Sequence, residues 1–115
     1  MAVEQPNLDY VHRLSDGDSL LEKRLIAVMI SEFESDYKDY KMAVADIDYK
    51  KIITFVHRLK HKIGFLGMEY SYQIAHKYEE ELHKNEGRLA PEFEHIMTQI
   101  SDFIKTLEER WNVSL

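Results

Sequence analysis

Histidines are the side chains in this sequence best suited to chemistry, because the chain contains no cysteine. The six histidines are His12, His57, His61, His76, His83 and His95. Without cysteine, the chain can form neither a disulfide framework nor a thiolate site. The sequence also contains no Gly-rich phosphate loop and no dinucleotide-binding fingerprint. The chemistry to consider is therefore that of the imidazole ring, as a metal ligand or as a nucleophile.

Two Glu-x-x-His pairs have the spacing of metal ligands in helical bundles. They are Glu80-x-x-His83 and Glu92-x-x-His95. At about 100° per residue, each histidine lies far from the apolar stripe of its own helix. We therefore expect both pairs to face water as surface neighbours, and we predict no interior metal site and no resident cofactor.

His57 and His61 are four residues apart, a spacing that can bind zinc at a helix surface. The glutamate of the His-Glu-x-x-His motif is missing here, because Arg58 follows His57. A third ligand would have to come from another part of the chain. A metal-binding bundle that uses His57 and His61 therefore stays open as a weaker alternative.

The position of His57 on its helix suggests a different use. Ile52, Val56, Leu59 and Ile63 form the apolar stripe expected to face the core. Measured from Ile52, His57 lies at about 140°, on the flank of the helix. Lys60 lies at about 80° and Gly64 at about 120° on the same side. A glycine inside a helix costs about 0.5–1 kcal/mol relative to alanine, so packing or access must account for Gly64.

An exposed, neutral imidazole can attack phosphorus through a ring nitrogen, which creates a phosphoimidazole. A lysine ammonium one turn away can stabilise the added negative charge. His57 and Lys60 have this relationship. The competing interpretation is an ordinary surface histidine in a lysine-rich helix, and the spacing alone favours this interpretation.

The elements that must position these residues are helical. The chain has 115 residues, 44% of them hydrophobic, with four glycines and two prolines. Apolar residues recur with helical spacing nearly throughout, and no segment alternates with period two. The predicted helices cover residues 7–14, 19–45, from a cap at Asp46 or Asp48 to near Gly67, 69–84, and from Pro91 through Leu107. On the helix over residues 19–45, the side chains expected to face the core are Leu21, Leu25, Val28, Met29, Phe33, Tyr37 and Tyr40. We expect one all-α domain over residues 1–115, an antiparallel four-helix bundle with a short N-terminal capping helix.

Charge and hydropathy limit the partners. The net charge is −6, the wrong sign for a protein that binds nucleic-acid phosphates. The apolar runs are too short to span a membrane, and the start has no pattern of a secretory signal, so we expect a cytoplasmic protein. Five basic residues lie within residues 50–62, which contain no acid: Lys50, Lys51, Arg58, Lys60 and Lys62. This segment is either a solvated helix face or a surface for an acidic partner.

Residues 57–67, HRLKHKIGFLG, resemble the signature of histidine-containing phosphotransfer (HPt) domains. That signature is His-x-Leu-Lys-Gly, then five residues, then Gly. The match holds at His57, Leu59, Lys60, Leu66 and Gly67. The size, the helical pattern and the run of residues 72–79 that leads to Leu82 also resemble the family.

The resemblance implies that His57 is the phosphoacceptor, that Lys60 stabilises the phosphoryl group and that Gly67 is the family's helix-end glycine. The chain departs from the family at His61, where the signature has glycine. An imidazole there either crowds an approaching partner or donates a hydrogen bond to the phosphoryl group, and it also makes His61 a candidate for modification. Arg58, His61, Gly64 and Gly67 are the candidate binding residues around the histidine.

The predicted function is that of a phosphorelay intermediate, a phosphocarrier with no kinase activity of its own. His57 would accept a phosphoryl group from a receiver-domain phospho-aspartate and pass it to another receiver domain. The implied partners are receiver domains of hybrid histidine kinases and of response regulators, and we expect a monomer. Docking is expected to use apolar residues such as Leu8 or Val11 and the start of the long helix that follows. The second alternative is a bundle that docks on a receiver without taking phosphate.

Overall fold

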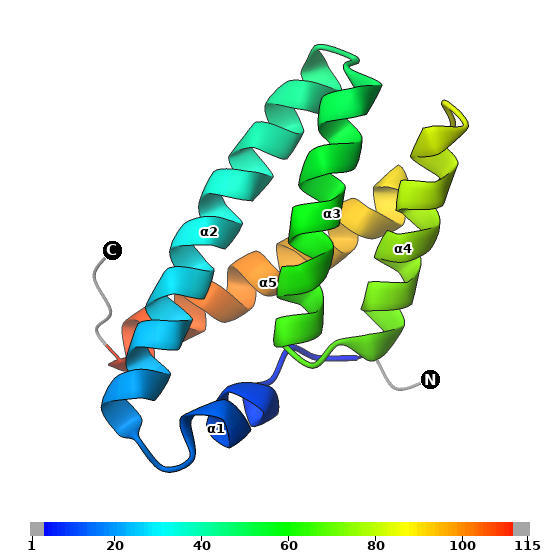
Figure 1. Cartoon of the computed structure of the whole chain (residues 1–115). Coiled ribbons are helices and arrows are strands. Elements are labelled where there is room, and N and C mark those ends of the chain that lie inside the picture. The colour runs from blue at the N-terminus through cyan, green and yellow to red at the C-terminus, as the bar shows by residue number, and fades with distance from the viewer. Residues whose placement is uncertain (1–3, 112–115) are drawn as a thin grey trace.

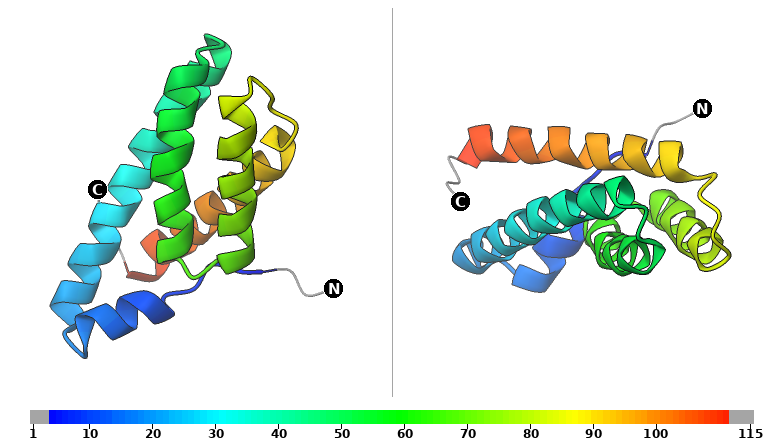
Figure 2. Two further views of the ribbon diagram at one scale, coloured as in Figure 1. Left: turned by 45° about the vertical axis from the view of Figure 1, so that its right-hand side comes forward. Right: turned by 90° about the horizontal axis from the view of Figure 1, so that it is seen from above.

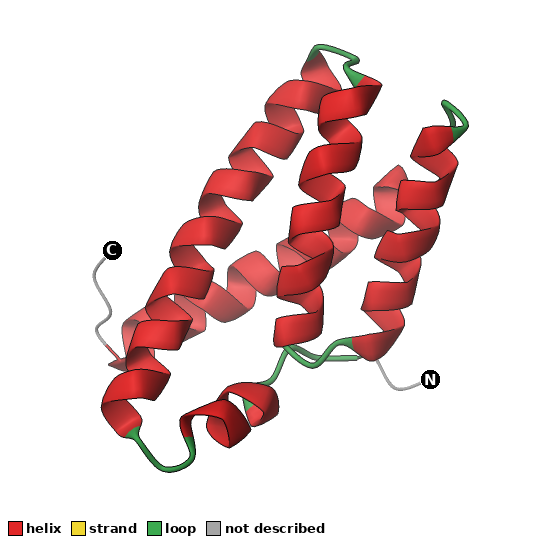
Figure 3. Cartoon of the chain, viewed as in Figure 1, coloured by secondary structure: helices red, strands yellow, loops and turns green. Residues whose placement is uncertain are grey.

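The computed structural model describes residues 4–111, and every regular element in this range is a helix (Figure 3). In chain order these helices are α1 (Asp9–Ser15), α2 (Ser19–Ala45), α3 (Tyr49–Phe65), α4 (Glu69–His83) and α5 (Ala90–Trp111). The predicted all-α class is confirmed for the described residues, and the predicted helices match these five closely. No helix within residues 4–111 is both long and apolar enough to cross a membrane.

The helices α2, α3 and α4 lie side by side, and each runs opposite to the one before it (Figure 1). α5 packs across these three at an oblique angle, as the two views in Figure 2 show. α1 lies at the end of the molecule where α2 begins and α3 ends, and its Tyr10 ring packs edge-on against Phe65 at 5.8 Å. α3 therefore has α2 on one flank and α4 on the other.

Aspartate side chains cap the N-termini of α2 and α3. The carboxylate of Asp18 accepts a hydrogen bond from the backbone N–H of Leu21 at 3.0 Å, which caps α2. Asp48 caps α3 in the same way by accepting from the N–H of Lys51 at 3.2 Å. Each carboxylate satisfies a donor that the first helical turn leaves without a partner. The sequence prediction left Asp46 and Asp48 as alternative caps of α3, and the structure uses Asp48.

The N-terminal segment holds α4 in place. Both carboxylate oxygens of Glu4 accept backbone hydrogen bonds at the start of α4, from Tyr70 at 2.9 Å and from Ser71 at 2.8 Å. The N–H of Asn7 donates to the carbonyl of Leu66 at 2.8 Å, at the end of α3. A segment distant in sequence thus closes the α3–α4 turn, which sets the position of α4 beside α3.

One apolar core is built from side chains of all five helices. On α3 the predicted stripe is confirmed, since Val56, Leu59 and Ile63 are fully buried. The residue between them, His57, points away from this core, so the stripe orients the histidine toward the flank that faces α4.

Within α2 the predicted stripe was wrong at two positions. Leu21 and Val28 were expected to face the core, but both are exposed, whereas Ile26 and Ile30 are fully buried. α2 carries more apolar residues than one helix face can bury. Several rotations of the helix therefore agree with its pattern, and packing against α3 and α5 selects one of them.

Candidate functional site

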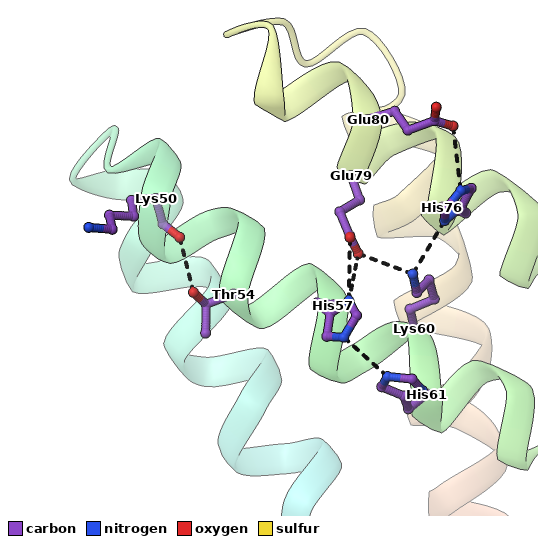
Figure 4. Close-up of polar contacts among 8 residues, drawn as sticks. All are labelled: Lys50, Thr54, His57, Lys60, His61, His76, Glu79 and Glu80. Atoms are coloured by element: carbon purple, nitrogen blue, oxygen red, sulfur yellow. Dashed lines mark hydrogen bonds and ion pairs between the residues drawn. The ribbon is translucent and has the colours of Figure 1, made fainter.

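His57 lies in the middle of α3 with a side chain that is 52% exposed. Its Nδ1 atom lies 3.1 Å from Oε1 and 3.3 Å from Oε2 of Glu79, on the neighbouring helix α4 (Figure 4). An ionised carboxylate can only accept, so Nδ1 must carry the proton and donate it in this contact. In the neutral ring, Nε2 then holds a lone pair. The contact with Glu79 thus selects the tautomer whose outward nitrogen is nucleophilic.

Glu79 is the centre of the polar cluster. Its side chain is 15% exposed, and Oε1 also accepts from Nζ of Lys60 at 3.3 Å. Burial alone would raise the pKa of Glu79, but the hydrogen bonds from His57 and Lys60, and their positive charge, lower it below its ordinary value. Glu79 is therefore ionised at neutral pH and joins His57 to Lys60.

Lys60 is buried, with a side chain that is only 6% exposed. Its ammonium lies 3.3 Å from Oε1 of Glu79 and 3.3 Å from Nδ1 of His76, and 5.6 Å from the centre of the Tyr72 ring. Because an ammonium can only donate, Nδ1 of His76 must accept. The helical wheel predicts Lys60 at the edge of the apolar stripe. In the structure its ammonium pairs with Glu79 and donates to His76, and both of these residues lie on α4.

His61 lies one turn after His57 on the same face of α3. The two Nε2 atoms are 3.3 Å apart, and the rings meet edge to face with centres 4.8 Å apart (Figure 4). With the proton of His57 on Nδ1, the N–H between the two rings must belong to His61. Burial, and the positive charges of His57, Lys60 and Lys62, lower the pKa of His61, which favours its neutral form. In this arrangement His61 donates to the lone pair that a nucleophilic His57 would use.

The two glycines of the motif, Gly64 and Gly67, have different structural roles. Gly64 is exposed, and a Cβ there would lie 3.3 Å from the ring of Tyr72, so it allows α3 to approach α4 closely. Gly67 follows the end of α3 with φ of +73°, and a Cβ there would lie 2.6 Å from the amide of Asn7. Gly67 therefore stands at the end of the helix, where its backbone conformation and its neighbour both exclude a side chain.

The basic segment of residues 50–62 is largely neutralised by acids from other helices. The Nε atom of Arg58 lies 3.0 Å from the buried Asp36 of α2, and Nζ of Lys62 lies 3.1 Å from Glu32 of the same helix. With Lys60 paired to Glu79, only Lys50 and Lys51 have no ion pair with a described residue. The sequence shows no acid within the segment, but the fold supplies acids from both neighbouring helices.

The expected docking residues are also revised. Val11 is fully buried in the core and Leu8 is partly buried, so Val11 cannot meet a partner. The exposed apolar side chains of α1 and of the start of α2 include Tyr10, Leu14, Leu20 and Leu21. Helix α1 is short, and its apolar face is used to cover the end of the core.

The two Glu-x-x-His pairs do not form a metal site, and Glu80 instead lies 3.6 Å from Nε2 of His76. His83 and His95 are exposed, as their positions on the helical wheel predict. Among residues 4–111 no group of three or more His, Cys, Asp or Glu side chains is placed to hold a metal ion. His57 and His61 are thus brought together as a pair without a third ligand from the described residues.

Sequence reasoning missed Glu79 and His76 as members of the site. Both lie on α4, at positions that contact the flank of α3 that carries His57 and Lys60. The only available signal was that residues 72–79 resemble the family's following helix. The pairing between helices depends on the rotation of α4, which its weak apolar stripe does not determine.

Comparison with family models, with curated proteins and with solved structures finds no match for the chain. The site is therefore interpreted from its own geometry and from the motif in its sequence.

Proposed function

We propose that the protein is a phosphocarrier that accepts a phosphoryl group on Nε2 of His57. The observation that carries the proposal is the contact between Nδ1 of His57 and the carboxylate of Glu79, at 3.1 Å. This contact keeps the proton on Nδ1 and leaves Nε2 as the nucleophile, on a ring that is half exposed. The resemblance of residues 57–67 to the HPt signature supports the same residue.

The proposed donor is the phospho-aspartate of a receiver domain. The Nε2 lone pair of His57 attacks phosphorus, a P–N bond forms and the P–O bond to the aspartate breaks, so that the aspartate leaves as a carboxylate. The proton on Nδ1 stays in the hydrogen bond with Glu79, whose negative charge stabilises the positive charge that develops on the ring. A second receiver aspartate then reverses the step.

Lys60 has a supporting role in this proposal. Its ammonium is anchored between Glu79 and His76, both at 3.3 Å. From this position it holds the Glu79 carboxylate and contributes positive charge near the phosphoryl group on His57. Because the Lys60 side chain is buried, its ammonium is already held in place. A flexible surface lysine would lose side-chain entropy before it could make the same contact.

The proposed docking face follows α3 from His57 toward the end of the helix. His57, His61 and Phe65 succeed each other every four residues, and Phe65 contacts the exposed ring of Tyr10. A stripe of this kind offers an apolar contact beside the reactive ring. Lys50 and Lys51, at the other end of α3, supply positive charge for the acidic active site of a receiver domain.

The broader setting belongs to the same proposal. We infer an antiparallel four-helix bundle of the HPt type formed by α2 to α5, with α1 as the capping helix. It would act as a monomer in the cytoplasm, where receiver domains of hybrid kinases and response regulators are its partners. The oblique course of α5 (Figure 1) is the feature that a regular bundle would not have.

A second candidate function is receiver docking without phosphate. It is favoured by the 3.3 Å contact between Nε2 of His61 and Nε2 of His57, which occupies the nucleophilic lone pair. Because His61 is exposed, its ring can turn away when a partner approaches. The phosphocarrier proposal requires this movement, and the docking proposal does not.

The test is label transfer from a phosphorylated receiver domain to the wild-type protein and to His57→Gln. The phosphocarrier proposal expects label on the wild-type protein that is labile in acid and stable in base, as a phosphoramidate is, and none on His57→Gln. Binding of receivers by both proteins, with no transfer from any of several receivers, would favour the docking module.

A further inference from the structure

The close approach of His57 and His61 is a feature that phosphoryl transfer does not require. Two imidazole nitrogens that share one proton can instead share a metal ion, and histidines four residues apart on a helix are a known arrangement of zinc ligands. The pair lies on the exposed face of α3, and both rings present Nε2 to each other (Figure 4).

The distance between the two nitrogens fits a metal. Two nitrogens bound to zinc at about 2.0–2.1 Å and at a tetrahedral angle lie about 3.3–3.4 Å apart. The Nε2 atoms of His57 and His61 are 3.3 Å apart. A cation can therefore take the place of the proton between the two rings without a change in the separation, provided that the proton of His61 moves from Nε2 to Nδ1 and the exposed rings turn slightly to aim both lone pairs at the cation.

The carboxylate of Glu79 is placed to support such a site. Histidines that bind metals commonly donate their other ring N–H to a carboxylate, which fixes the tautomer and raises the basicity of the ligand. Glu79 accepts from Nδ1 of His57 at 3.1 Å and is itself held by Lys60. His57 is thus already in the tautomer that binds a metal through Nε2.

The charges around the pair permit a cation. The sequence alone suggests a strongly basic face, but Glu79 pairs with Lys60, Asp36 with Arg58, and Glu32 with Lys62. These ion pairs compensate positive charges beside the two imidazoles, so that a cation can approach them.

We infer that His57 and His61 form a two-imidazole site for a divalent transition-metal ion of the zinc class, with Glu79 as support and water in the remaining positions. With two protein ligands the ion exchanges readily, so it is a regulatory ligand and not a resident cofactor. Its effect on signalling rests on the proposed function: metal and phosphoryl group need the same lone pair of His57, so bound metal blocks phosphoryl acceptance.

The binding test uses Zn²⁺ alone, added to tag-free and metal-free full-length protein in a calorimeter. The variants are His57→Gln and His61→Gln, with His95→Gln as the matched control because His95 is exposed on α5. Circular dichroism checks that each variant is folded. We expect one site in the wild type and in His95→Gln, and at least tenfold weaker binding in both His57→Gln and His61→Gln. Unchanged binding in either of these two variants would overturn the site.

A second measurement separates this inference from the proposed function. Zn²⁺ is added to the transfer assay. The wild type and His61→Gln are each assayed with the same phosphorylated receiver, so that any effect of zinc on the receiver is the same for both proteins. We expect zinc to inhibit transfer to the wild type at least tenfold more strongly than transfer to His61→Gln. Equal inhibition would contradict the competition. If calorimetry shows the site but no receiver transfers label, the metal site stands and the phosphocarrier proposal fails.

Discussion

The carboxylate of Glu79 on α4 lies 3.1 Å from Nδ1 of His57 on α3, and this contact determines which nitrogen of the neutral histidine keeps a lone pair. It joins two helices through a residue that the sequence motif does not contain. The same carboxylate also holds the ammonium of Lys60 at 3.3 Å. The three side chains form one unit that joins α3 to α4.

The substitution His57→Gln should separate chemistry from folding. Because the His57 side chain is half exposed and lies outside the core, we expect the free energy of unfolding to change by no more than about 1 kcal/mol. Phosphoryl acceptance should be lost completely. Chemical denaturation and the transfer assay measure the two effects, and a substantially destabilised variant would contradict the placement of His57 on the flank.

The neighbouring core residues should behave in the opposite way. Leu59 and Ile63 are fully buried on the same helix, so Leu59→Ala and Ile63→Ala should each cost about 2–5 kcal/mol. Denaturant unfolding of the two variants beside His57→Gln checks this contrast. Costs below about 1 kcal/mol would mean that this stripe of α3 is not the one that faces the core.

Lys60→Met tests the anchored ammonium while it keeps most of the side-chain volume. We expect slower phosphoryl transfer, because Glu79 loses the cation that holds it and the phosphoryl group loses a nearby positive charge. The control is Lys62→Met, since Lys62 pairs with Glu32 and has no contact with Glu79. Transfer rates that are unchanged in Lys60→Met, or equally reduced in both variants, would remove the assigned role.

Glu79 should make stability depend on pH in a defined direction. Its pKa in the folded protein is lowered from an ordinary value of 4.5, so its ionised form stabilises the fold. This stabilisation is present in full above pH about 4.5 and is lost as the pH falls through the lowered value. We therefore expect Glu79→Gln to be less stable than the wild type at pH 7 and the difference to shrink in acid. A difference that is constant from pH 7 to pH 3 would contradict this.

Gly67→Ala should destabilise the α3–α4 turn by about 1–3 kcal/mol. The backbone there has φ of +73°, and a Cβ would collide with the Asn7 side chain at 2.6 Å. Gly87→Ala is the matched control, because a Cβ at Gly87 meets nothing within 4 Å. Thermal unfolding of both variants should show a loss for Gly67→Ala alone, and equal melting temperatures would contradict the role of this turn.

The helices and the orientation of α3 could be predicted because each depends on local signals. Asp18 and Asp48 cap helices at positions that the sequence marks, and the stripe of α3 has one phase only. The apolar residues of α2 agree with several rotations of the helix, so the sequence pattern wrongly predicted that Leu21 and Val28 face the core. The sequence could not predict that Glu79 contacts His57, because this contact depends on how α4 packs against α3.

The charge of the basic segment illustrates the same limit. Residues 50–62 contain no acid, yet Arg58 and Lys62 are paired with Asp36 and Glu32 of α2. A charge pattern along one helix does not reveal the charges that neighbouring helices place beside it. The surface left for an acidic partner is consequently smaller than the sequence indicates.

The most direct test of the central claim is to identify the phosphorylated atom. The ¹⁵N-labelled protein would be phosphorylated by a receiver domain, and the ¹⁵N–³¹P coupling in its NMR spectrum would be assigned to one ring nitrogen. We predict coupling to Nε2 of His57 and to no other nitrogen. A phosphoryl group on Nδ1 of His57, or on His61, would contradict the tautomer that Glu79 imposes and with it the proposed site.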